Sequence, residues 1–127
     1  MADQVVTLTE DAVRYPIARI KWDWLSATGG TVVSATANAY EGKVVRCTLQ
    51  SDSGDTAPTN LYDVTITDGD EVDILSGAGA NVTAAATVSI TDPTKTLYVR
   101  TSKLELNIAN AGDAKGGIVI LDILRAV

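Results

Sequence analysis

The sequence of 127 residues contains no histidine, no phenylalanine and a single cysteine. Without histidine, the chain lacks the side chain that most often shuttles protons near neutral pH and most often binds metal ions. One cysteine cannot form a disulfide within the chain. These absences exclude the most common forms of acid–base, metal and disulfide chemistry.

The cysteine, Cys47, lies in a segment that alternates between apolar and polar residues, residues 43–50. The alternation places Val45, Cys47 and Leu49 on the inward face and Val44 outward. No histidine or nearby base is available to lower the pKa of the thiol. Cys47 is therefore predicted to be a small buried hydrophobic residue.

Basic residues are few, with 10 Lys and Arg against 16 Asp and Glu and a formal net charge of −6. An acidic chain is not attracted to DNA, RNA or anionic lipid, so neither nucleic acid nor a membrane is expected as a partner. No apolar window approaches the roughly 18 to 20 residues of a membrane helix. The N-terminus has no basic segment followed by an apolar run, so no secretion signal is predicted and we expect a soluble protein made in the cytosol.

Aromatic residues make up 5% of the chain, so aliphatic side chains and alanine must build most of the core. Valine and threonine are abundant and there are 10 glycines but 3 prolines, a composition that favours strands joined by short turns. A chain of this length is enough for one domain with a modest core.

The clearest β-pattern lies in the middle of the chain. Residues 62–67 alternate between apolar and polar side chains, as in a strand with one buried and one solvated face. Asp68 and Gly69 tolerate the left-handed conformation of a tight turn, and Val72 and Ile74 resume the alternation. The sequence therefore predicts a β-hairpin here.

Other segments share this strand periodicity: residues 17–25, 31–40, 43–50, 87–90, 96–100, 103–109 and 118–124. About nine short strands joined by turns predict a single-domain, all-β protein, either an antiparallel β-sandwich or a small β-barrel. Residues 118–124 are apolar on both faces, so we expect this strand in the middle of a two-layer packing or against a neighbouring subunit. Residues 1–16 are predicted to be an N-terminal arm that leads into the domain of residues 17–127.

Two tryptophans, Trp22 and Trp24, lie on one face of the predicted strand 17–25. The simplest interpretation is that both fill a core that has no phenylalanine. The alternative is that one of them anchors a subunit or partner, which is a common role for tryptophan.

One acidic cluster merits testing as a site, and it consists of Asp63, Asp68, Asp70, Glu71 and Asp73. Its spacing does not match a calcium-binding EF-hand loop. A pair of carboxylates for cleaving glycosides, Asp63 and Asp73, would need aromatic walls that the 2 Trp and 4 Tyr, scattered along the chain, do not supply. A solvated turn is the favoured interpretation, and no catalytic residue, metal or cofactor is predicted.

Four segments carry a similarity to known proteins: residues 57–68, 72–75, 79–81 and 104–112, the last leading into the final apolar strand. These segments resemble small β-rich virion proteins of tailed bacteriophages. The resemblance covers about residues 42–124 and consists of strand and turn residues.

The resemblance implies a structural protein without enzymatic activity, and first of all a decoration, or cement, protein that binds the capsid exterior and stabilises the head. The implied partners are the major capsid protein and further copies of the chain, with a trimer expected. The implied location is the capsid surface of a virion made in the host cytoplasm. A head-to-tail or tail-associated adaptor is the alternative within the particle.

The residues expected to contact a partner are Val5, Val6, Leu8, Tyr15, Trp22 and Trp24. The N-terminal arm is expected to lie over the capsid or an adjacent copy and to add a strand to an exposed sheet edge. An alternative from a different class is a surface carbohydrate-binding module, which requires Trp22 and Trp24 to be exposed on one flat face.

Overall fold

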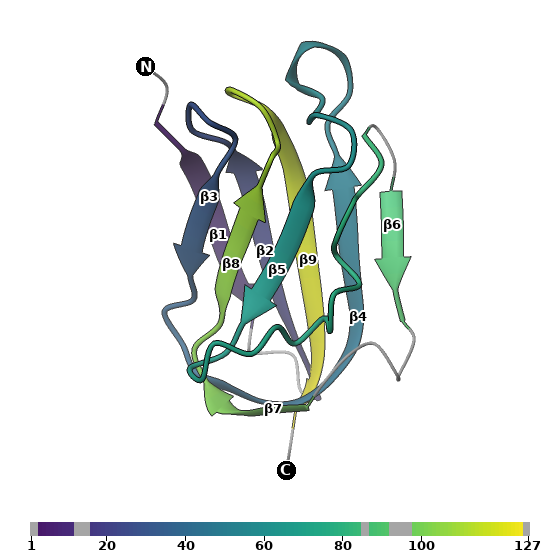
Figure 1. Cartoon of the computed structure of the whole chain (residues 1–127). Coiled ribbons are helices and arrows are strands. Elements are labelled where there is room, and N and C mark those ends of the chain that lie inside the picture. The colour runs from purple at the N-terminus through teal and green to yellow at the C-terminus, as the bar shows by residue number, and fades with distance from the viewer. Residues whose placement is uncertain (1–2, 12–15, 85–86, 92–97, 126–127) are drawn as a thin grey trace.

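The computed structural model describes residues 3–11, 16–84, 87–91 and 98–125. Within these residues the chain forms nine β-strands and one short 3₁₀ turn, η1 (Gly54–Thr56). The strands form two antiparallel sheets that pack face to face as a sandwich (Figure 1). The predicted all-β class is confirmed, and of the two predicted architectures the chain adopts the sandwich, because the sheets do not close into a barrel.

The larger sheet, sheet A, has six strands in the order β1-β2-β9-β4-β6, and β7 pairs with the first part of β4. Its strands are β1 (Val5–Asp11), β2 (Ile17–Leu25), β4 (Tyr40–Ser51), β6 (Thr87–Ile90), β7 (Tyr98–Ser102) and β9 (Gly116–Arg125). The C-terminal strand β9 occupies the centre, paired with β2 on one side and β4 on the other.

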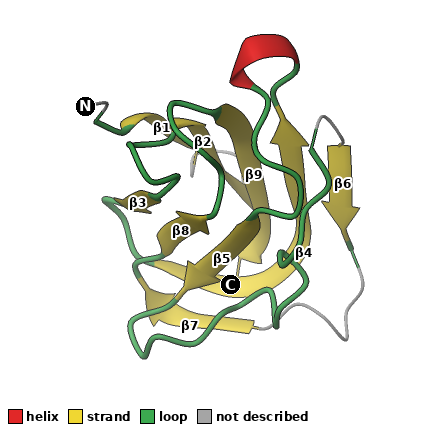
Figure 2. Cartoon of the chain, turned by 45° about the horizontal axis from the view of Figure 1, so that its top comes forward, coloured by secondary structure: helices red, strands yellow, loops and turns green. Residues whose placement is uncertain are grey.

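The smaller sheet, sheet B, lies in front of sheet A in Figure 1 and has three strands in the order β3-β8-β5. These are β3 (Val32–Ala35), β8 (Glu105–Ala109) and β5 (Asp63–Thr67). Strand β4 is long and curved, so that its first part and β7 pass across the end of the sandwich (Figure 2). Gly42 allows this bend, since a Cβ there would collide with the carbonyl oxygen of Leu124.

The core lies between the sheets and takes one face from each strand. The alternation predicted for residues 17–25, 62–67 and 103–109 is confirmed, because every second side chain in them is at most 2% exposed. These side chains are Ala18, Ile20, Trp22, Trp24, Tyr62, Val64, Ile66, Leu104, Leu106 and Ile108. Trp24 of sheet A contacts Tyr62, which precedes β5, with ring centroids 5.8 Å apart. Large aromatic rings therefore join the two layers where phenylalanine is missing.

Strand β4 departs from the predicted alternation because it contains a β-bulge. Its pairing with β9 shifts register between Val44 and Arg46, so Val44 is buried and Val45 is partly exposed. A bulge adds one residue to one strand and reverses which residues face inward. The predicted orientations of Val44 and Val45 were therefore wrong, whereas Cys47 and Leu49 are buried as predicted.

The predicted hairpin after residue 67 forms only at its tip. The N–H of Glu71 donates to the carbonyl of Asp68 (3.1 Å), and Glu71, not Gly69, adopts the left-handed conformation (φ 64°). Beyond this turn, Thr67 and Asp73 form one isolated bridge in place of a second strand. The chain then follows the outer edge of β5 as a loop.

This loop, residues 73–82, covers the edge of β5 with backbone hydrogen bonds. The N–H of Val64 donates to Gly79 (2.8 Å), and the N–H of Ile74 donates to Ile66 (2.8 Å). Gly79 approaches so closely that a Cβ would overlap the carbonyl oxygen of Val64. The loop therefore takes the place of a neighbouring strand.

The N-terminal residues join the sheet of their own chain. Strand β1 pairs with β2 from Val5 opposite Leu25 to Asp11 opposite Arg19. Residues 5–11 of the segment assigned to an arm are thus an edge strand of sheet A. Tyr15, one of the predicted partner contacts, lies outside the described residues.

Candidate binding surfaces

Five of the residues predicted to contact a partner can be placed. Trp22 and Trp24 lie in the core, 0% and 2% exposed, so neither indole offers the flat face that a carbohydrate-binding module requires. Val6 and Leu8 point from β1 toward the core and are partly buried against it. Val5, on the opposite face of β1, is 59% exposed.

The acidic cluster of residues 63–73 supports turns and does not converge on one point. The Asp63 carboxylate accepts hydrogen bonds from the backbone N–H of Asn81 and the side chain of Asn110, both at 2.9 Å. The Asp73 carboxylate accepts from three backbone N–H groups, those of Ile66, Leu75 and Gly77, at 2.9 to 3.2 Å. In the part of the chain that the structure describes, no three acidic or cysteine side chains are placed to hold a metal ion.

Cys47 is buried, as predicted, and is not in a disulfide. Burial, with smaller contributions from Asp122 and Asp73, raises the pKa of its thiol to about 12. The thiol is therefore protonated at neutral pH and lacks the thiolate character that a nucleophile needs.

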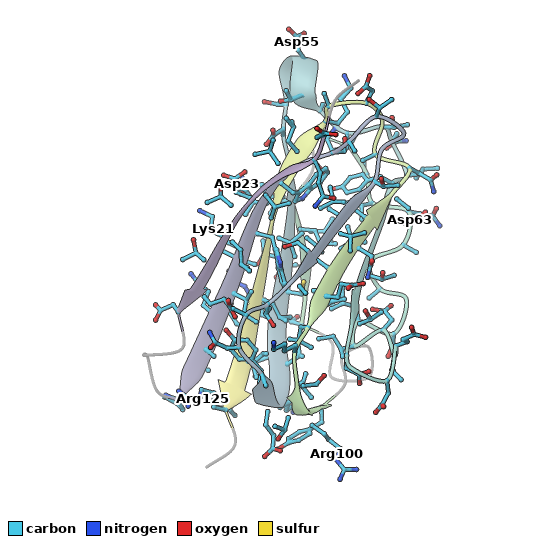
Figure 3. All side chains as sticks on the ribbon, turned by 90° about the vertical axis from the view of Figure 1, so that its left-hand side faces the viewer. Lys21, Asp23, Asp55, Asp63, Arg100 and Arg125 are labelled. Carbon is cyan, nitrogen blue, oxygen red and sulfur yellow. The ribbon has the colours of Figure 1, made fainter. Side chains whose placement is uncertain are left out.

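The outer face of sheet A is the surface least like an ordinary solvated face. Aliphatic side chains from β2, β4 and β9 alternate there with residues that face the core: Ile17, Leu25, Val45, Ile118, Ile120 and Leu124. Leu124 is 41% exposed and the other five are partly exposed. Figure 3 shows Lys21 and Asp23 of β2 on this face, on the side of the molecule opposite to Asp63 of sheet B.

A row of alternating charges crosses the same face. The strand register places Asp11 opposite Arg19, Arg19 opposite Asp122, and Asp122 opposite Arg46. The row therefore runs acid, base, acid, base over β1, β2, β9 and β4. We call these four residues the charge row.

Arg19 and Asp122 form a bidentate ion pair within the charge row. Nε of Arg19 donates to Oδ1 of Asp122 (2.8 Å) and Nη2 donates to Oδ2 (3.3 Å). The Asp122 side chain is 8% exposed and that of Arg19 is 55% exposed. The hydrogen bonds and charge of Asp122 raise the pKa of Arg19.

A hollow of about 660 Å³ lies over the charge row and is lined by Asp11, Ile17, Arg19, Val45, Arg46 and Asp122. The bulge contributes directly, because it leaves Val45 and Arg46 on the same side of β4. The sequence signal for this surface was the run of residues 118–124, apolar on both faces.

A second feature joins β1 to sheet B through side chains. The Gln4 carboxamide donates to the carbonyl of Val33 (2.7 Å) and accepts from its N–H (2.9 Å), as a neighbouring peptide group would. The Glu10 carboxylate accepts from two backbone N–H groups and one hydroxyl: Ala37 (3.0 Å), Asn38 (3.2 Å) and Tyr40 (2.8 Å). Burial alone would raise the pKa of Glu10, but these hydrogen bonds outweigh it and lower the pKa.

Comparison with known proteins finds no relative: no family model, no curated protein and no solved structure matches the chain. Across the described residues, no helix is long and apolar enough to span a membrane.

Proposed function

We propose that this chain is a structural binding protein without catalytic activity, and that it is a decoration protein on the capsid exterior of a tailed bacteriophage. The observation that carries the binding role is the outer face of sheet A, where aliphatic side chains lie beside the charge row. Exposed apolar groups bordered by polar ones are typical of surfaces that contact another protein. The choice of a decoration protein follows from the resemblance over about residues 42–124.

The hydrogen bonding of the reactive residue types supports a non-catalytic role. Asp63 and Asp73, which would have to act as a catalytic pair, are engaged by amide groups that fix local turns. The thiol of Cys47 is buried with a raised pKa. An enzyme needs such groups free to meet a substrate in a cleft.

The proposal is tested with purified particles of the phage whose genome carries this sequence. Mass spectrometry against the major capsid protein should find the chain in hundreds of copies, because a decoration protein covers the whole head. About a dozen copies would assign it to a head-to-tail or tail-associated ring. Absence from the particle would overturn the phage assignment.

A binding experiment then tests the role of the face. Capsids lacking the chain are mixed with purified protein and sedimented, and wild type should co-sediment and protect the capsids against heating. Variant I118K places a charge on the outer face of sheet A and should reduce occupancy. Variant N107K, on the outer face of sheet B, is the matched control and should bind as wild type.

A further inference from the structure

We propose that the outer face of sheet A is a homodimer interface, on which a second copy of the chain packs face to face about a two-fold axis parallel to the strands. The inference deepens the proposed binding role by naming a second copy of the chain as the partner of this face, so that I118K lowers capsid occupancy by dissociating the dimer and not by removing a direct capsid contact. It rests on that role but not on the phage assignment, so the two can fail separately.

The outer face of sheet A departs from the pattern of a solvated sheet. An antiparallel sheet with one face on the core normally exposes polar residues on the other. Strand β9 instead places Ile118, Ile120 and Leu124 outward, in the centre of sheet A. Covering these side chains removes apolar surface from water, and each Å² removed contributes about 25 cal/mol of favourable free energy.

The order of signs in the charge row favours a second copy as the partner. A two-fold axis that runs along the strands between β2 and β9 reverses the strand order of the second copy. The row acid, base, acid, base then faces base, acid, base, acid. Asp11 of each copy meets Arg46 of the other, and each Arg19 lies over the other copy's Asp122.

Other two-fold arrangements do not give this match. An axis along the row would place each charge over its own symmetry mate, which opposes association. The row spans three strand spacings, on the order of 14 Å. Four alternating charges at this spacing are thus self-complementary in one orientation, the property that an isologous interface requires.

Covering the face leaves each member of the charge row beside a residue of opposite sign. Lys21 and Asp23, the other two charged residues of β2 on this face, are also of opposite sign. Asp122 is already 6% exposed and is held by Arg19 from its own chain. The charge row contains two acids and two bases and is neutral, although the whole chain carries a formal charge of −6. Desolvation of a paired, two-pronged contact costs less than desolvation of a single ion.

The oligomeric state of the purified full-length chain tests the proposal. Sedimentation velocity at micromolar to hundred-micromolar concentration should show a species of twice the 13.3 kDa monomer mass, and higher salt should weaken it. A monomer across this concentration range would overturn the proposal. If the chain is monomeric and I118K nevertheless abolishes capsid binding, the face contacts a different protein. The proposed function then survives.

Charge-swap variants test the two-fold axis itself. Variants R46D and D11R each place like charges opposite one another across the interface and should weaken dimerisation on the order of tenfold or more. The double variant D11R/R46D restores opposite signs at this contact and should recover much of the loss. Failure of the double variant to recover, or a dimer unaffected by either single change, would overturn this arrangement.

Two controls separate association from folding. Variant E105R makes a comparable charge change on the outer face of sheet B and should leave the dimer unchanged. Circular dichroism and thermal unfolding of each variant establish that it is folded. If a charge-reversed variant unfolds, I120K replaces it, because it changes the centre of the face without touching the charge row, and it should also give a monomer.

Discussion

The two sheets of this sandwich have equally apolar inner faces and very different outer faces. The outer face of sheet B carries Thr65 opposite Asn107 and Thr67 opposite Glu105, as expected for a solvated sheet, with the exposed Val33 beside Asn107. The outer face of sheet A carries the aliphatic residues of β9 beside the charge row. The inner faces explain the fold, whereas the difference between the outer faces is the basis of the proposed interface.

The largest expected effect concerns the ion pair of Arg19 and Asp122 in sheet A. Variant R19M leaves the buried carboxylate of Asp122 without its two-pronged partner and should lower the free energy of unfolding by about 2 to 3 kcal/mol. Urea denaturation of wild type and R19M measures this difference in the free energy of unfolding.

The reverse change and a control on sheet B sharpen this prediction. Variant D122N leaves the solvent-accessible Arg19 without its carboxylate partner. It should lower the free energy of unfolding less than R19M does, because an exposed guanidinium remains hydrated. Variant E105Q should stay within about 0.5 kcal/mol of wild type. If R19M and E105Q lowered the free energy of unfolding equally, the ion pair of Arg19 and Asp122 would contribute no more to stability than an ordinary surface charge.

A smaller effect is expected where Glu10 of β1 accepts hydrogen bonds from the connection between β3 and β4 and from Tyr40. Because its pKa is lowered in the folded state, its stabilising contribution is complete above the ordinary pKa of 4.5 and is lost as the pH falls through the folded value. Variant E10Q should lose about 1 kcal/mol at neutral pH and less at pH 3.

Unfolding curves at several pH values measure the Glu10 contribution. The difference in stability between wild type and E10Q should shrink as the solution is acidified. A difference that is constant with pH would mean that the carboxylate contributes nothing through its charge. Variant E41Q, from the first part of β4, is a control for a carboxylate outside this contact.

The smallest effect on stability is expected from exchanging the character of the two outer faces. Variants I120T and T65I each keep a β-branched residue in a strand, so each should change the free energy of unfolding by less than about 1 kcal/mol. Association should respond differently, since I120T removes apolar area from sheet A and T65I adds it to sheet B. A dilution series by light scattering should show weaker dimerisation for I120T alone.

The faces of the individual strands could be predicted because the period-2 pattern is a local property. Residues 17–25, 62–67 and 103–109 were predicted to be strands from the alternation of immediate neighbours, and Trp22, Tyr62 and Leu106 in these strands are buried. The bulge at Val45 could not be predicted, because it depends on how β4 pairs with β9. Alternation alone cannot show where the pairing slips by one residue.

The charge row could not be predicted for a related reason. Its members come from residues 11, 19, 46 and 122, which become neighbours only when four strands are aligned in register. The sequence did indicate that residues 118–124 are apolar on both faces. It could not indicate that one of these faces remains uncovered by the chain itself.

The short contact between Gln4 and Val33 has a consequence for how the molecule behaves when crowded. Free strand edges allow chains to join into open-ended fibres. Here a carboxamide occupies the peptide groups of Val33 at one rim of sheet B, and residues 73–82 occupy the other rim. Sheet B therefore resists growth by strand addition, and many copies can be held at high local density without fusing along their backbones.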